Sequence, residues 1–215
     1  AKDFGWLGMH EMAERIDDTL TAMNGLERFR GHFYNWYDTH DLRPLDPKYI
    51  SSVDSGNLAG HLIAVGNTCR EMIKRPLVDS KWMVGIADAL MLTRESLDAL
   101  TNDRRTQTVS RKRLDEELDI FAASLREVPA TPAAVVTKME ELAEHANTLA
   151  DIARTLIEEG GEGQYPESGA DVLFWTEAAR ASIKSHEQDI ALLKPWSRFA
   201  AAVKLDPEIV PEENL

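Results

Sequence analysis

The stretch TPAAVVTKMEELAEHANTLADIARTLIEEGG, residues 131–161, carries the strongest fold signal in the sequence. Thr131 and Pro132 form a typical N-cap and first-turn pair, because the threonine hydroxyl can accept a backbone N–H of the first turn and proline fits the first helical position. Apolar residues then recur at helical spacing until Gly160-Gly161 end the run. They are Val135, Leu142, Leu149, Ile152 and Leu156. The stretch predicts one long amphipathic helix.

The same three-and-four spacing marks five further segments, near residues 5–24, 52–73, 82–100, 109–127 and 168–193. Their apolar positions are, in order, Met12, Ile16, Leu20 and Met23; Leu58, Leu62, Val65, Cys69 and Met72; Trp82, Ile86, Leu90, Thr93, Leu97 and Leu100; Leu114, Leu118, Phe121 and Leu125; and Val172, Trp175, Ala179, Ile183, Ile190 and Leu193. Ser52 or Asp54 is expected to cap the second helix, and Pro76 to end it. A short helix with Trp196 and Phe199 is expected after Pro195. No alternating strand pattern is present, so the sequence predicts an all-α fold of about seven helices.

Composition narrows the range of functions. The chain has 215 residues and a net charge of −13, which disfavours nucleic acid and anionic membrane surfaces as partners but leaves neutral ligands such as sugars. No apolar run approaches the roughly 20 residues that a membrane helix needs. The one cysteine, Cys69, occupies an apolar helical position and is expected to be a core thiol. No nucleotide-binding glycine loop and no metal-ligand spacing of histidines is seen, so neither a cofactor nor a metal is expected.

A second stretch, GHFYNWYDT at residues 31–39, concentrates aromatic side chains next to a carboxylate. In an extended strand one side would carry His32, Tyr34, Trp36 and Asp38, and the other Phe33, Asn35 and Tyr37. The first side mixes flat apolar faces with hydrogen-bonding groups, which is the mixture that a sugar ring requires. Core packing is the ordinary alternative for such a cluster.

A third stretch, SSVDSGNLAGHL at residues 51–62, places small polar groups at a helix start. Asp54 is either a helix cap or an acid. Ser55 and Asn57 add polar groups, and Gly56 allows a close backbone approach. From the residues alone, the sequence indicates a helical protein with a candidate carbohydrate cleft.

The sequence also resembles a known family over these stretches. LERFRGHFYNWYDT, followed by PLDPKYISSVDSGNLAGHL, is similar to the corresponding part of the cyclic β-1,2-glucan synthases. The preceding DFGWLGMHEMAERIDDTLTAM resembles the family's helix before that motif. The resemblance is specific over residues 3–66, weaker at KWMVGIADAL, and limited to a variable helical region over 103–205.

The resemblance implies a place in a much larger enzyme. These synthases are bacterial inner-membrane proteins with a membrane-embedded glycosyltransferase, a middle glucoamylase-like α/α-barrel domain that cyclises the glucan by transglycosylation, and a phosphorylase-like domain. The chain, which starts without methionine and ends at PEENL, is therefore expected to be an excised piece of such a protein. Residues 1–75 would begin the glucoamylase-like domain, 76–104 would form a connecting helix, and 105–215 an antiparallel helical bundle insertion.

The resemblance also implies site residues, partners and a location. His32, Tyr34, Trp36, Tyr37, Ser55 and Asn57 are expected to contact substrate, and Asp38 and Asp54 are candidate catalytic carboxylates, since glycosyl transfer commonly uses a pair of them. The expected partners are a β-1,2-glucan chain and other domains of the same synthase. The fragment would be soluble and inactive alone, on the cytoplasmic side of the inner membrane, without touching the bilayer itself. A non-catalytic carbohydrate-binding module and a helical scaffold are the alternatives.

Overall fold

The chain is described by a computed structural model that covers residues 1–74, 80–100, 105–160 and 168–196. Its elements are η1 (Lys2–Phe4), α1 (Met9–Gly25), β1 (Arg28–Phe29), β2 (His32–Phe33), α2 (Ser52–Met72), α3 (Lys81–Ala99), α4 (Arg105–Ser124), α5 (Pro132–Gly160) and α6 (Ser168–Leu193). Within those residues the fold is helical apart from one small hairpin, which confirms the all-α prediction.

The chain divides into two compact units. Ala1–Met12 and Leu77–Leu215 form the first, here called the bundle unit, and Ala13–Pro76 form the second, the hairpin unit. This grouping differs from the expected division at residues 75 and 105. The helix α3 is a packed member of the bundle rather than a connecting helix, and the first twelve residues belong with it.

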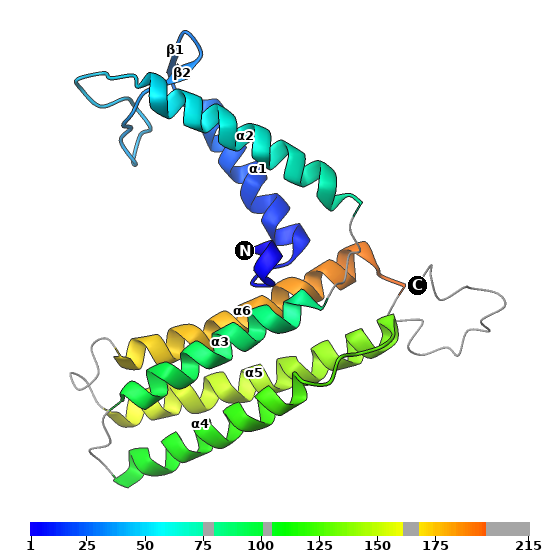
Figure 1. Ribbon diagram of the computed structural model, residues 1–215. Helices are drawn as coiled ribbons and strands as arrows, with labels where there is room; N and C mark the ends of the chain where they lie inside the picture. Colours follow the sequence, from blue (N-terminus) through cyan, green and yellow to red (C-terminus); the bar gives the residue numbers. More distant parts are fainter. Residues whose placement is uncertain (75–79, 101–104, 161–167, 197–215) are drawn as a thin grey trace, which may run out of the picture. The chain divides into compact units, whose positions relative to one another are not determined.

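The bundle unit is built from α3, α4, α5 and α6, each running opposite to the helix before it (Figure 1). The helix α6 packs against both α3 and α5, and α5 also packs against α4. Thr131 caps α5 as predicted, because its hydroxyl accepts the Ala134 N–H at 3.1 Å. The four helices thus form an antiparallel bundle that includes α3.

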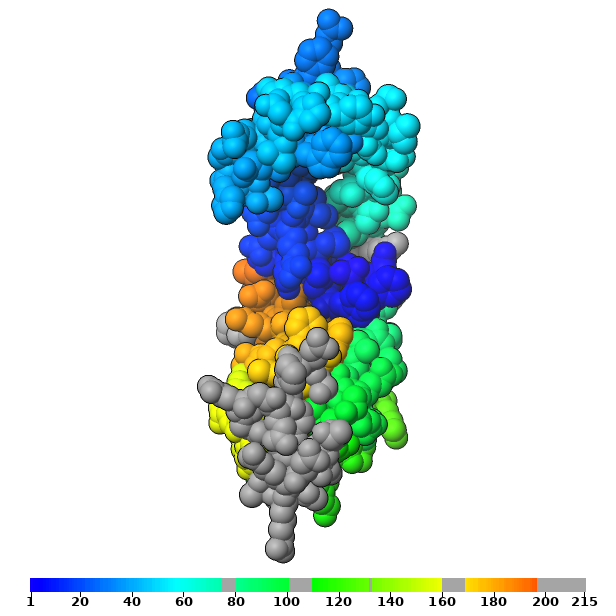
Figure 2. Space-filling model, turned by 90° about the vertical axis from the view of Figure 1, so that its left-hand side faces the viewer, coloured from blue at the N-terminus to red at the C-terminus, as the bar shows by residue number. Residues whose placement is uncertain are grey.

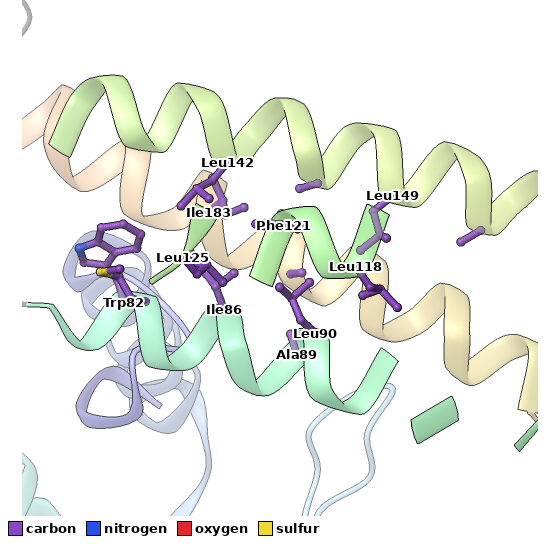
Figure 3. Close-up of a cluster of buried hydrophobic side chains, with 14 of the residues drawn as sticks. Trp82, Ile86, Ala89, Leu90, Leu118, Phe121, Leu125, Leu142, Leu149 and Ile183 are labelled. Atoms are coloured by element: carbon purple, nitrogen blue, oxygen red, sulfur yellow. The ribbon is translucent and has the colours of Figure 1, made fainter. Parts of the chain in front are cut away.

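The apolar positions predicted for α3 to α6 form one core. Side chains of all four helices meet in it, among them Ile86, Phe121, Leu142 and Ile183 (Figure 3). Phe121 and Leu142 are fully buried, and burial of one such side chain contributes about 1.5–3 kcal/mol. Three predicted positions depart from this pattern, because Leu193 is exposed and Ile152 and Trp175 are half-buried.

The N-terminal segment docks closely onto the bundle. Figure 2 shows it in dark blue beside α6 in orange and α3 in green. Asp189 of α6 is buried and accepts the N–H groups of Met9 and His10 at 2.6 and 2.8 Å, so a residue distant in sequence caps the start of α1. The Gly8 N–H donates to the Ser185 hydroxyl at 2.8 Å. A Cβ on Gly85 would lie 2.1 Å from the Gly5 carbonyl oxygen, so the two backbones nearly touch.

The hairpin unit has little core of its own. Its strands β1 and β2 are antiparallel and are joined by Arg30 and Gly31, whose φ angles of 52° and 88° are typical of a tight two-residue turn. Among residues 13–74 only Pro44 and Met72 are buried.

Two predictions for the second helix are wrong. Cys69 is exposed rather than a core thiol. The N-cap is Ser51, whose hydroxyl accepts the Asp54 N–H, rather than Ser52 or Asp54. The apolar face of the helix is open, with Leu62 39% exposed. The helix ends at Met72, while Pro76 and Phe199 lie outside the described residues.

Candidate functional site

A groove of about 770 Å³ lies within the hairpin unit. One wall comes from the hairpin and the residues just after it, and the other from the start of α2. Its apolar lining is Phe33, Leu58, Ala59 and Leu62, and its polar lining includes Arg28, His32, Tyr34, Asn35, Asp54 and Ser55. The groove thus combines rings and aliphatic groups with both donors and acceptors of hydrogen bonds.

The Asp54 carboxylate is held in place by the opposite wall. Asn35 donates from Nδ2 to Asp54 Oδ2 at 2.9 Å, and its Oδ1 accepts the Ser51 N–H at 3.1 Å. Ser51 in turn accepts the Asp54 N–H. Since Asp54 lies in the first turn of α2, the helix dipole also favours its negative charge. Asn35 therefore joins the two walls and fixes the carboxylate between them.

Tyr34 is presented to the groove by a small polar network. The Tyr37 hydroxyl accepts the Tyr34 N–H at 2.9 Å and donates to the Glu27 carbonyl at 2.8 Å. Lys48 lies 5.3 Å from the centre of the Tyr34 ring and donates to the Glu27 carboxylate at 2.9 Å. That hydrogen bond raises the pKa of Lys48 above its ordinary value. Tyr37 thus supports the backbone of Tyr34 and does not line the groove itself.

Trp36 and Tyr49 form a separate aromatic pair. Their ring centres are 6.0 Å apart and their planes are inclined by 29°. Both side chains stay more than half exposed, at 56% and 53%. Neither residue is among those that line the groove.

Asp38 stabilises a turn instead of facing the groove. Its carboxylate accepts the His40 N–H at 2.8 Å and lies 3.9 Å from Arg43 Nη2. Its backbone N–H donates to the Arg43 carbonyl at 2.9 Å. The expected alternation from His32 to Asp38 is wrong, because β2 ends at Phe33.

The groove therefore gathers part of the predicted set. It brings together His32, Tyr34, Asp54 and Ser55, but Trp36, Tyr37, Asp38 and Asn57 do not line it. The sequence reasoning missed Arg28 as a groove residue and gave Asn35 no role. Reading Arg30-Gly31 as a two-residue turn would have paired Arg28 with Phe33 and so placed the arginine beside the aromatic residues.

Two common features, a metal site and a membrane-spanning helix, are absent from the described residues. No group of three or more His, Cys, Asp or Glu side chains there is arranged to hold a metal ion. None of the helices described is both long enough and apolar enough to cross a membrane.

Comparison with known proteins gives one informative similarity. No protein-family model matches the sequence. The chain is 35% identical over 195 residues to the cyclic beta-(1,2)-glucan synthase NdvB of Rhizobium meliloti (strain 1021). The match covers 88% of this chain, so it extends well beyond residues 3–66 and includes parts of both units. The chain spans about 7% of the length of this curated relative.

Proposed function

We propose that the chain is a piece of a glucan-synthesising protein of this kind, and that the groove is part of the surface that holds the glucan chain. The first statement is supported by the 35% sequence identity to a cyclic beta-(1,2)-glucan synthase, which extends over 88% of the chain. The groove supports the second, because its walls carry the two kinds of group that a sugar needs. In this proposal the hairpin unit belongs to a glucoamylase-like α/α barrel on the cytoplasmic side of a bacterial inner membrane.

The observation that carries the binding role is the placement of Asp54 opposite the hairpin. A pyranose ring has an apolar face that packs against aromatic rings and hydroxyls that must keep hydrogen bonds when they leave water. Tyr34 and Phe33 offer rings, and the Asp54 carboxylate accepts hydroxyl protons from a position fixed by Asn35. Such preorganisation reduces the entropy lost on binding.

Binding is favoured over catalysis for this part of the chain. Glycosyl transfer commonly uses two carboxyl groups on either side of the scissile bond. Asp54 lines the groove, but Asp38 is engaged in a turn and does not. We therefore propose Asp54 as an acceptor of sugar hydroxyls, and we expect the catalytic pair of the parent enzyme to include residues outside this chain.

The test is a titration of the 215-residue chain with linear β-1,2-glucan oligosaccharides, followed by NMR. We expect saturable shifts at His32, Tyr34 and Ser55. Replacing Asp54 by Ala should weaken binding about tenfold or more, because a hydrogen bond to a charged group contributes roughly 1.5–3 kcal/mol.

The control is Asp18→Ala, which removes an equal charge from an exposed position of α1 in the same unit. This change should leave the affinity unaltered. Absence of saturable shifts in the unsubstituted chain at millimolar oligosaccharide, or equal losses for Asp54→Ala and Asp18→Ala, would contradict a sugar-binding groove.

A further inference from the structure

We infer that Arg28 is a second sugar-binding group of the groove, and that Nε and Nη1 of its guanidinium donate hydrogen bonds to sugar hydroxyls. The inference rests on the proposed function and adds to it a donor that faces the same groove as the Asp54 acceptor. It would make Arg28 a determinant of which sugar hydroxyls the groove accepts.

The guanidinium of Arg28 is held on two sides. Its Cζ lies 4.8 Å from the centre of the Phe33 ring, the partner of Arg28 across the hairpin. Its Nη2 donates to the Met23 carbonyl at 3.3 Å and to Asn24 Oδ1 at 3.2 Å, both at the end of α1. These contacts fix the plane of the group, so little freedom remains to be lost when a ligand binds.

The guanidinium has donors to spare. Within the described residues, neither Nε nor Nη1 of Arg28 makes a hydrogen bond, although the side chain lines the groove. These N–H groups lie in the plane of the guanidinium, whose position is set by Phe33 and by the end of α1. The hydroxyls of a glucan chain offer acceptors for such fixed donors.

Charge favours a neutral polyhydroxyl ligand over an anion. Arg28 and Asp54 line the same groove, yet the described residues show no ion pair between them. An anion that approached Arg28 would also meet the Asp54 carboxylate, which repels it. A sugar uses both groups, because its hydroxyls accept from Arg28 and donate to Asp54.

The hairpin supplies a matched control in Arg30. This residue carries the same charge two positions away, but its guanidinium lies 5.3 Å from the centre of the Phe29 ring and it does not line the groove. Replacing Arg30 by Ala therefore removes one positive charge from the hairpin without removing the proposed donor.

The experiment measures the affinity of the whole 215-residue chain for a linear β-1,2-glucan oligosaccharide by NMR titration. Arg28→Ala should weaken binding about tenfold or more. Arg28→Lys keeps the charge and the aliphatic stem but loses the planar group with its fixed Nε and Nη1 donors, so it should bind within about threefold of Arg28→Ala. Arg30→Ala should bind like the unsubstituted chain.

Three results would overturn the inference while leaving the proposed function standing. They are full affinity of Arg28→Lys, full affinity of Arg28→Ala, and equal losses for Arg28→Ala and Arg30→Ala. If Arg28→Ala perturbs the hairpin, as backbone shifts of His32 and Phe33 would reveal, Arg28→Lys decides alone. No binding by the unsubstituted chain would instead remove the proposed function and this inference together.

Discussion

Gly8 occupies the point where the N-terminal segment approaches α6 most closely. A Cβ at this position would lie 2.6 Å from the Ser185 carbonyl oxygen and 2.7 Å from Asp189 Oδ2. Both neighbours are fixed, the first in helix backbone and the second by its bonds to Met9 and His10. We expect Gly8→Ala to destabilise the chain by about 1–3 kcal/mol, in the manner of an overpacked core. Urea denaturation followed by circular dichroism measures this change.

Gly60→Ala provides the comparison. Gly60 lies inside α2. Apart from its chain neighbours and the nearby backbone of its own helix, no atom lies within 4 Å of its would-be Cβ. Alanine is favoured over glycine in a helix by about 1 kcal/mol. This variant should be at least as stable as the unsubstituted chain. If Gly8→Ala were equally stable, the close docking of residues 1–12 would be refuted.

At the residue scale, the sequence pointed to groove residues next to a strand or at a helix start, but not to those whose position depends on the loop after β2. Tyr34, Asp54 and Ser55 line the groove, and they lie directly after β2 or in the first turn of α2. Asp38 and Trp36 do not, because their assignment assumed a strand that continued through residue 38. The role of Asn35 depends on bonds to residues 16 and 19 positions away, which no local spacing reveals.

At the element scale, periodicity predicted the helices well but not their burial. The apolar positions of α3 and α4 are buried as expected, whereas α2, with an equally apolar pattern, leaves Val65 36% exposed. A periodic pattern identifies the apolar face of a helix. It does not tell whether the surface that covers this face lies in the same piece of chain.

The contact of α4 with α5 contains a buried charge, Lys138, whose side chain is 8% exposed. Burial opposes its charged form, but hydrogen bonds to Glu141 and Glu127 outweigh it, so the pKa of Lys138 lies above its ordinary value. The pKa of Glu141 is lowered, mainly by the hydrogen bond from the Ser124 hydroxyl and then by that from Lys138. The two helices are thus joined by a polar cluster next to the core.

These shifts predict how stability depends on pH. A carboxyl with a lowered pKa stabilises the fold above its unfolded pKa, and the contribution disappears as pH falls through the folded value. Glu141→Gln should therefore be less stable than the unsubstituted chain near neutral pH, and the difference should narrow on acidification. Because Glu141 is 43% exposed, the difference should stay under about 1 kcal/mol. Lys138 contributes below its unfolded pKa and loses its contribution only as pH rises through its raised value.

The measurement is thermal unfolding of both chains from neutral to acidic pH, with Glu140→Gln as the control. Glu140 is the exposed neighbour of Glu141 and makes no ion pair among the described residues. A difference for Glu141→Gln that stayed constant with pH, or that Glu140→Gln reproduced, would show that this carboxylate does not contribute as described.

At the scale of the whole molecule, burial is very unevenly divided. The bundle unit holds the hydrophobic core and draws in residues 1–12, which hydrogen-bond to α6 across about 180 positions of sequence. No local pattern predicts such a contact, so the sequence reasoning assigned these residues to the other part of the chain. The hairpin unit holds the candidate site, but of its described residues, 13–74, it buries only Pro44 and Met72.

This asymmetry predicts different rates of backbone hydrogen exchange in two helices of similar length. The helix α3 has 19 residues and buries eight of them, whereas α2 has 21 residues and buries Met72 alone. Since exchange depends on local opening, which burial opposes, amides in the middle of α2 should exchange at least about tenfold faster than those of α3.

Linear β-1,2-glucan should then slow exchange in the first turn of α2 and leave α3 unchanged, because a ligand stabilises the region that it binds. Equal protection of the two helices without ligand would mean that the hairpin unit is as firmly held as the bundle, and protection of α3 by the glucan would place its binding site elsewhere.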